Sequence, residues 1–192
     1  MPLFAAMAED RAHFDRAMSP AEPKRRSWRE LLANDAFAVL MLWRLRVWAR
    51  RHRVPLVNHV SRRAQTVLFG IELGNEVTLG RGVCFVHPVA VVVGGTARIG
   101  DRVRFMGSNT IGTVSDNGYR TIEDDVCIGA GARVLRPVRV GARSLIGANA
   151  VVVDDVPADS VAVGVPAVIR PRSDRAIGGN VDRSCPESLA LR

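Results

Sequence analysis

A bulky apolar residue recurs at every sixth position from Leu73 onward, and this period restricts the fold more than any other feature of the sequence. The next position is often glycine, and the fifth position of the unit is usually small or β-branched, as at Val77, Val83 and Val89. The recurring apolar positions fall into three runs: Leu73, Leu79 and Phe85; Val93, Ile99, Phe105 and Ile111; and Ile122, Ile128, Val134, Val140, Ile146 and Val152.

A six-residue unit with one large and one small inward side chain forms a short strand followed by a tight turn. Glycine suits the corner of such a unit, because it adopts backbone angles that a Cβ atom disfavours. Units of this kind stack through parallel strands and bury a continuous core. The sequence therefore predicts a mainly β protein, a parallel β-helix of hexapeptide repeats with a short N-terminal helical region.

The six-residue period is interrupted twice. The step from Phe85 to Val93 is eight positions instead of six, and the step from Ile111 to Ile122 is eleven. The first interruption contains His87, and the second is the polar, turn-rich stretch "TVSDNGYR". Because extra residues must leave a regular coil, and loops on a rigid scaffold commonly carry sites, both interruptions are candidates for the active site. We expect them to meet either within one chain or across a subunit contact.

His87 is the one histidine of the repeat region, and a neutral imidazole accepts a proton from an attacking hydroxyl near pH 7. We therefore predict that His87 is a general base. The alternative is an imidazole whose hydrogen bonds are satisfied at a coil corner. Cys84 is a weaker candidate, as a nucleophile or as a metal ligand with His87, because no second His or Cys pair accompanies it in the repeats.

The chain divides into four parts by its local pattern. "SWRE" places a serine at a helix N-cap and Glu30 three residues later, which predicts a helix from about Trp28 to Arg51. Pro55 suits the start of a second helix that ends near Gly70. The expected parts are a loosely ordered tail over 1–26, with a short helix in it as the alternative, a helical cap over 27–70, the β-helix over 71–172 and a mobile tail over 173–192.

The helical cap carries a run of arginines together with Trp43 and Trp48. We expect it to pack on the β-helix or on a neighbouring subunit, with a peripheral membrane contact as the alternative. Lys and Arg outnumber Asp and Glu by 27 to 19, which favours anionic ligands or serves solubility, and we expect no nucleic-acid partner. Three cysteines without paired spacing, no secretory signal and no spanning segment predict a cytoplasmic protein.

Two stretches carry a specific family resemblance: "GIELGNEVTLGRGVCFVHPVAVVVGG" and "CIGAGARVLRPVRVGARSLIGANAVVVDDVPADSVAVGVPAVI". They resemble the serine acetyltransferase group of hexapeptide-repeat acyltransferases, including short forms that O-acetylate exported polysaccharides. The resemblance covers about residues 71 to 170 and implies a left-handed β-helix, acetyl-CoA as acetyl donor, no metal, and a homotrimer, with a hexamer of two trimers as the alternative. It also implies that His87 is the base and that Glu72 orients its ring.

The acceptor side departs from the serine acetyltransferases, which have an aspartate directly before the histidine and an Arg-His pair in the loop of the second interruption. Val86, Gly118 and Tyr119 occupy these places here. Without charged partners a buried amino-acid zwitterion is costly, and Arg120 replaces at most the carboxylate contact. We therefore predict a small-molecule or glycan acceptor held by Val86, Tyr119 and Arg120, with an uncharged saccharide hydroxyl preferred.

The small residues of the later coils suit a narrow groove for acetyl-CoA: Gly129, Ala130, Gly147 and Ala148. Arg170 and Arg172 are candidates for its phosphates. The leading hypothesis is an acetyl-CoA-dependent O-acetyltransferase of polysaccharide biosynthesis. The alternatives are a serine O-acetyltransferase of cysteine biosynthesis and a non-catalytic β-helix that binds a glycan or a protein.

Overall fold

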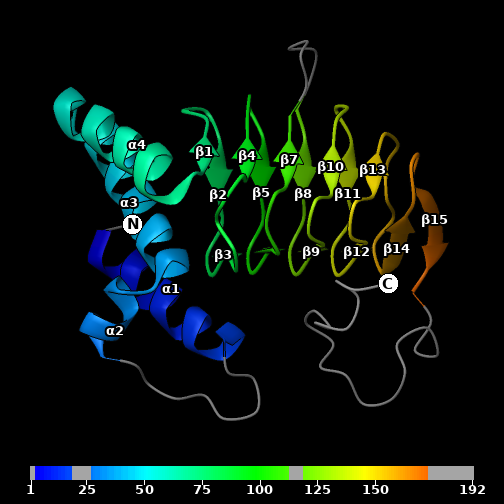
Figure 1. Cartoon of the computed structure of the whole chain (residues 1–192), viewed down its shortest axis with the longest axis horizontal. Helices are drawn as coiled ribbons and strands as arrows, with labels where there is room; N and C mark the ends of the chain where they lie inside the picture. The colour runs from blue at the N-terminus through cyan, green and yellow to red at the C-terminus, as the bar shows by residue number, and fades with distance from the viewer. Residues whose placement is uncertain (1–2, 19–26, 113–118, 173–192) are drawn as a thin grey trace.

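The computed structural model describes residues 3–18, 27–112 and 119–172 and shows a stack of β-coils with a group of helices at one end (Figure 1). The first four coils each contribute one short strand to each of three sheets, so that the described strands build a three-sided prism. This arrangement confirms the predicted parallel β-helix with a helical N-terminal region. The last described strand differs, because β15 (Val168–Pro171) runs antiparallel to β14 (Ser160–Val163).

The sheets, here called A, B and C, follow one another in chain order around each coil. Sheet A contains β1 (Glu72–Leu73), β4 (Val92–Val93), β7 (Thr110–Ile111), β10 (Arg133–Val134) and β13 (Val151–Val152). Sheet B contains β2 (Thr78–Leu79), β5 (Arg98–Ile99), β8 (Thr121–Ile122) and β11 (Arg139–Val140). Sheet C contains β3 (Cys84–Phe85), β6 (Arg104–Phe105), β9 (Cys127–Ile128), β12 (Leu145–Ile146), β14 and β15. The connecting segments form the A-to-B, B-to-C and C-to-A corners.

The second residue of each two-residue strand fills the core, as the six-residue period predicts. Leu73 is fully buried in sheet A, and the rings of Phe85 and Phe105 stack in sheet C with centroids 5.0 Å apart. Backbone hydrogen bonds join successive coils, for example from the amide of Gly94 to the carbonyl of Ile111 at 2.8 Å. The prism therefore combines parallel-sheet hydrogen bonding with one continuous apolar core.

The first interruption shifts which residue points inward. The repeat count predicts Val89 at a core position, but this prediction is wrong, because Val89 is 64% exposed and Val91 is buried. The amide of Val91 donates to the carbonyl of Pro88 at 3.2 Å, and Ala90 between them adopts a φ of 58°. The two extra residues are thus accommodated in a tight turn before Val91.

Helices α1 (Leu3–Met18), α2 (Trp28–Leu32), α3 (Asp35–Arg51) and α4 (Pro55–Phe69) lie at the end of the prism where its first coil begins (Figure 1). The predicted capping box is confirmed at Ser27 and Glu30. The single helix expected after it is interrupted, because the Asn34 side chain accepts hydrogen bonds from two amides and caps α3 separately. The C-terminal tail expected over 173–192 lies outside the described residues.

Helix α1 occupies a segment that the sequence predicts as loosely ordered. Its Asp10 carboxylate is buried, pairs with Arg44 of α3 at 2.7 Å and accepts a hydrogen bond from the amide of Gly82 at 2.9 Å. Phe14 packs edge-on against Phe37 with ring centroids 5.3 Å apart. These tertiary contacts, which local sequence does not encode, fix α1 on the prism.

Two arginines of α3 close the open end of the β-helix. The first coil has no coil beneath it, so the strands leave its carbonyls unpaired. Arg44 donates to the carbonyls of Leu79 at 3.1 Å and Gly80 at 2.6 Å. Arg46 is 1% exposed and donates to the carbonyl of Leu73 through both terminal nitrogens at 3.1 Å. Arginine provides several donors in one plane, which suits this capping role.

Burial, together with the nearby positive charges of Arg62 and Arg50, lowers the pKa of the Arg46 guanidinium to about 10. This cost of burial is offset by hydrogen bonds to the side chains of Gln65 at 2.6 Å and Asn75 at 2.9 Å. Arg44 and Arg46 of the basic run therefore face the prism, whereas Arg50, Arg51 and Arg53 are exposed.

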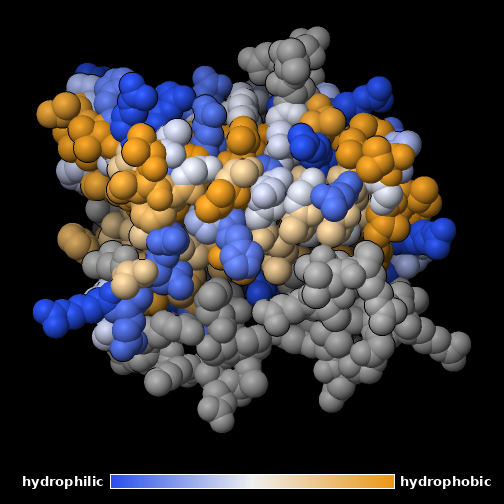
Figure 2. Space-filling model, viewed as in Figure 1, coloured by the Kyte–Doolittle hydropathy of each residue, from blue (hydrophilic) through white to orange (hydrophobic). Residues whose placement is uncertain are grey.

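The other side of the helical end remains exposed. The apolar residues of α4 with the greatest exposure are Leu56, Val60, Val67 and Leu68, and Figure 2 shows apolar colour over this end of the molecule. No helix among the described residues has the length and apolar character needed to cross a membrane.

Replacement of Arg46 by methionine tests the capping role. The variant keeps the aliphatic stem but leaves the carbonyl of Leu73 and the Gln65 side chain without donors, so we expect a loss of about 2–4 kcal/mol of unfolding free energy. Urea denaturation followed by circular dichroism measures the change. Arg51→Met, at an exposed position at the end of the same helix, is the matched control and should change stability by less than about 0.5 kcal/mol. Equal stability of the two variants would contradict the capping role.

Candidate active site

His87 lies at the C-to-A corner between β3 and β4, with its side chain exposed. The residues on either side are held more firmly, because Pro88 is buried and the amide of Val86 donates to the carbonyl of Phe105 at 2.8 Å. The corner thus presents an accessible imidazole on a fixed backbone. This geometry suits a base that must meet a substrate from solution.

Gly107 stacks directly on His87 in the next coil. A Cβ atom at Gly107 would lie 3.0 Å from both the Cβ atom and the carbonyl oxygen of His87, and its φ of 125° is a conformation that side chains disfavour. The buried Asn109 fixes this turn, because its Oδ1 accepts from the amide of Gly107 at 3.0 Å and its Nδ2 donates to the carbonyl of Gly129 at 2.7 Å. The chain therefore supports His87 closely from above.

Sequence reasoning missed Gly107 and Asn109. A signal was present, because Asn109 is a polar amide at the fifth position of a repeat unit, where small or β-branched residues are usual. A polar side chain at an inward position must find partners, and the partners of Asn109 are the corner backbone.

The predicted small residues form a column above His87 at the same corner. The pairing of β3, β6, β9 and β12 puts Ala130 and Ala148 in register with His87 and Gly107. Gly129 and Gly147 form the adjoining column, where an added Cβ atom would lie 2.6 Å from the amide nitrogen of Ala148 and 2.7 Å from a methyl group of Val163, respectively. The glycines therefore let successive coils stack closely, and the column of small residues leads to the candidate base.

Glu72 lies on β1, beside the corner that carries His87. Its amide donates to the carbonyl of Val91 at 2.9 Å, but its carboxylate pairs with Arg62 of α4 at 3.5 Å, and both side chains are about half exposed. No hydrogen bond between Glu72 and His87 is present among the residues that the structure describes. The orienting role of Glu72 therefore stays a prediction.

Tyr119 and Arg120, the described end of the second interruption, lie at the A-to-B corner before β8, on the opposite edge of sheet A from His87. Tyr119 is 62% exposed and packs against the guanidinium of Arg98, which lies 5.0 Å from the ring centroid. Arg120 is only 1% exposed, so its guanidinium lies inside this chain. A single chain thus does not bring Tyr119 to His87, and Gly118 lies outside the described residues.

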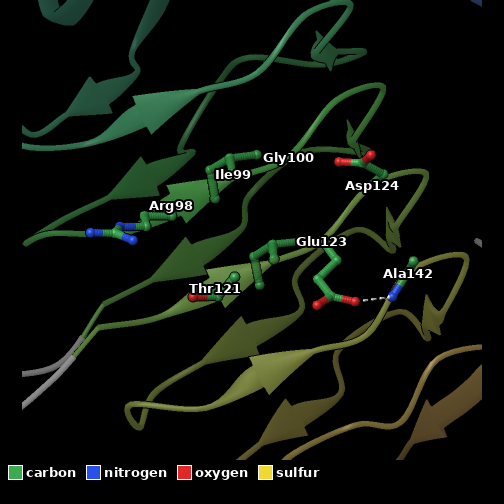
Figure 3. Close-up of a pocket in the computed structure, with 8 residues that line it drawn as sticks. Arg98, Ile99, Gly100, Thr121, Glu123, Asp124 and Ala142 are labelled. Carbon is green, nitrogen blue, oxygen red and sulfur yellow. Dashed lines mark hydrogen bonds between the residues drawn. The ribbon is translucent and has the colours of Figure 1, made fainter.

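Sheet B carries a shallow trough of about 350 Å³ next to this corner. Figure 3 shows Arg98 at one end of the trough and the carboxylates of Glu123 and Asp124 toward the other, with Thr121 between them. Glu123 accepts a hydrogen bond from the amide of Ala142 at 2.8 Å, and a hydrogen bond from Arg139 lowers its pKa. The acidic end of the trough is thus partly occupied by internal partners.

The alternatives at Cys84 lose support. The thiol is buried, and burial raises its pKa to about 11, so it remains protonated at neutral pH. No cluster of three metal-ligating side chains occurs over residues 3–18, 27–112 and 119–172.

Comparison with known proteins places this geometry in a family. Residues 121–154 match the model for the bacterial transferase hexapeptide (six repeats). The serine acetyltransferase of Mycobacterium tuberculosis is 36% identical over 147 residues, which cover 75% of this chain and 64% of that protein. The serine acetyltransferase of Synechococcus elongatus is 34% identical over 193 residues, which cover 98% of this chain and 77% of that protein.

The chain belongs to the serine acetyltransferase-like group of hexapeptide-repeat acyltransferases. Solved structures agree with this assignment. A serine acetyltransferase from Vibrio cholerae superimposes with a TM-score of 0.75 at 28% identity and covers 90% of this chain and 70% of that one. A serine acetyltransferase in complex with CoA gives a TM-score of 0.74 at 26% identity, covering 86% of this chain and 70% of that one.

Arg170 and Arg172, which the sequence predicts to contact the phosphates of CoA, do not lie on the column above His87. The amide of Arg172 donates to the carbonyl of Asp159 at 2.7 Å, and its guanidinium donates to the carbonyl of Arg143 at 2.9 Å, which puts it at the B-to-C corner. Arg170 is exposed on β15, opposite Val161 in sheet C. Contact of either residue with phosphates stays a prediction.

Replacement of Gly107 by alanine tests whether close packing of this glycine keeps His87 in position in this acyltransferase. We expect Gly107→Ala to lower the rate of acyl transfer about 10- to 100-fold, because a displaced base loses its alignment with the reacting hydroxyl. Gly94→Ala is the matched control, since the nearest atom to an added Cβ there is 3.9 Å away. Initial rates and melting temperatures of both variants separate misplacement from unfolding, and a fully active Gly107→Ala would show that His87 needs no such support.

Proposed function

We propose that this chain is a serine O-acetyltransferase, which moves the acetyl group of acetyl-CoA to the side-chain hydroxyl of L-serine. The observation that carries the proposal is His87, an exposed imidazole on a fixed corner at the foot of a narrow column of small residues. The named relatives support the acceptor, because they are serine acetyltransferases over most of this chain, and solved members are in complex with serine or CoA. The saccharide acceptor favoured by the sequence has no support among them.

In the proposed reaction, Nε2 or Nδ1 of neutral His87 accepts the proton of the serine hydroxyl while its oxygen attacks the thioester carbonyl. The tetrahedral intermediate expels the CoA thiolate, which takes the proton from the imidazolium. The products are O-acetylserine and CoA, and no covalent enzyme intermediate forms. Glu72 serves as the positioning residue, since its exposed pair with Arg62 is weak and yields to the imidazolium when that charge develops.

In this proposal acetyl-CoA binds along the column of small residues. Side chains larger than alanine would fill this corner, so the thioester approaches His87 along Ala148, Ala130 and Gly107. The acetyl group then reaches the base at the lower end of the column.

The proposal includes a homotrimer. His87 and Tyr119 lie on opposite edges of sheet A within one chain, so a site that uses both requires a second copy. A three-fold axis in front of sheet A, parallel to the long axis of the prism, brings the C-to-A corner of each copy against the A-to-B corner of the next. Sheet C of one copy and sheet B of the next then form the two walls of each cleft.

Removal of the imidazole tests the proposed reaction. We expect His87→Ala to lower the rate of thiol release from acetyl-CoA with L-serine by about 100- to 10,000-fold, with acetyl-CoA binding retained. His59→Ala, at an exposed histidine of α4, is the matched control and should retain the wild-type rate. Wild-type activity of His87→Ala would exclude a general base at this position. Turnover of a panel of neutral sugars in place of L-serine would exclude serine as the acceptor.

A further inference from the structure

Arg98 is an exposed arginine that forms no ion pair with the described residues of this chain. It is the outward residue of β5, which lies between β2 and β8 in sheet B, and its guanidinium lies 5.0 Å from the ring centroid of Tyr119. Among the described residues it has no carboxylate partner. Arg139, which occupies the same outward column, differs because it pairs with Glu123.

Stacking on Tyr119 holds the guanidinium without using its N–H groups. A cation over an aromatic face is attracted by the ring quadrupole, while the donors of the guanidinium point outward in its plane. These donors match the two oxygens of a carboxylate. Arg98 is thus a preorganised site for one carboxylate group at the rim of the trough (Figure 3).

The height of Arg98 along the prism matches that of His87. The corner that carries His87 leads into β4, and β5 is the next strand of the same coil. Neighbouring coils are about 4.8 Å apart, so the two residues differ in height by less than one coil spacing. A rotation about an axis parallel to the long axis of the prism leaves heights along the prism unchanged. In the proposed trimer, Arg98 of one copy therefore faces the partner's His87 across the cleft. Arg139 lies two coils higher, roughly 10 Å away along the prism.

L-Serine brings a carboxylate to this cleft. A carboxylate removed from water needs a cationic partner, and the buried Arg120 does not present its guanidinium at the surface. Val86, on the corner of His87, carries no charge. Arg98 is the described arginine that combines exposure, a fixed orientation and the correct height.

We infer that Arg98 is a specificity-determining residue, which binds the α-carboxylate of a 2-amino-3-hydroxy acid acceptor while Tyr119 holds its guanidinium in place. This inference rests on the proposed function and adds the group that recognises the acceptor. The carboxylate is bound equally in the ground state and in the transition state, because it takes no part in the chemistry. Loss of Arg98 therefore raises the KM for the acceptor and leaves kcat nearly unchanged.

The test compares L-serine with L-serinamide, which keeps the hydroxyl and the ammonium group but lacks the carboxylate. We expect the wild type to prefer L-serine in kcat/KM, and Arg98→Met to lower this preference about 10- to 100-fold through a raised KM for L-serine. The KM for acetyl-CoA should stay unchanged. Arg102→Met is the matched control, since this exposed arginine pairs with Asp125 at the B-to-C corner and should keep the preference.

The outcomes are distinguishable. A wild type that turns over L-serine together with an Arg98→Met variant of unchanged preference would overturn the role of Arg98 alone. A wild type that does not turn over L-serine would overturn the proposed function and this inference with it. An equal loss of activity toward both acceptors would indicate a structural role for Arg98 and would also count against the inference.

Tyr119 provides an independent check. Tyr119→Phe keeps the ring and should retain the preference for L-serine, whereas Tyr119→Ala removes the platform and should weaken it. In the Arg98→Met background, Tyr119→Ala should have no additional effect on the preference, since the guanidinium that it orients is absent. An additive effect of the two substitutions would contradict the role of Tyr119 as a platform for Arg98.

Discussion

The β-helix depends on hydrogen bonds between successive coils, and the first coil is where this pattern would otherwise end. Arg44 and Arg46 of α3 donate to the carbonyls that no strand pairs, and Asp10 of α1 holds Arg44 and the amide of Gly82 at the same time. The site lies only a short distance above this closed end, at the corner that leaves the first coil. A rigid first coil is therefore a condition for a fixed His87.

Much of this architecture follows from the sequence, because the repeat is local. Six residues suffice to specify one strand and one turn, so the strands and the corner of His87 are predictable from spacing alone. The register at the interruption is less predictable, because a count of eight does not say which two residues are extra, and Val91 rather than Val89 enters the core. The helical end is the least predictable part, since α1 is held by contacts with residues far along the chain.

The candidate site also contains some residues that the repeat predicts and others that it does not. His87 and the small residues above it follow from the repeat, and the register of sheet C brings them into one column. Glu72 follows from the resemblance, but its carboxylate pairs with Arg62 on a helix whose position no repeat encodes. Arg98 has no signal in the sequence, because an outward arginine on a short strand looks like any other solvated residue until its stacking on Tyr119 is visible.

The position of Arg98 also bears on how such a fold can change its acceptor. An outward strand residue is fixed by two neighbouring coils, whereas a residue in an inserted loop depends on the conformation of the loop. Recognition from β5 therefore loses less conformational entropy on binding than recognition from the loop alone. In sheets A and B the first residue of each strand is exposed or partly exposed, so a single substitution there adds or removes a charge without disturbing the inward pattern. The prism thus permits a change of acceptor at the height of the base without rebuilding the base itself.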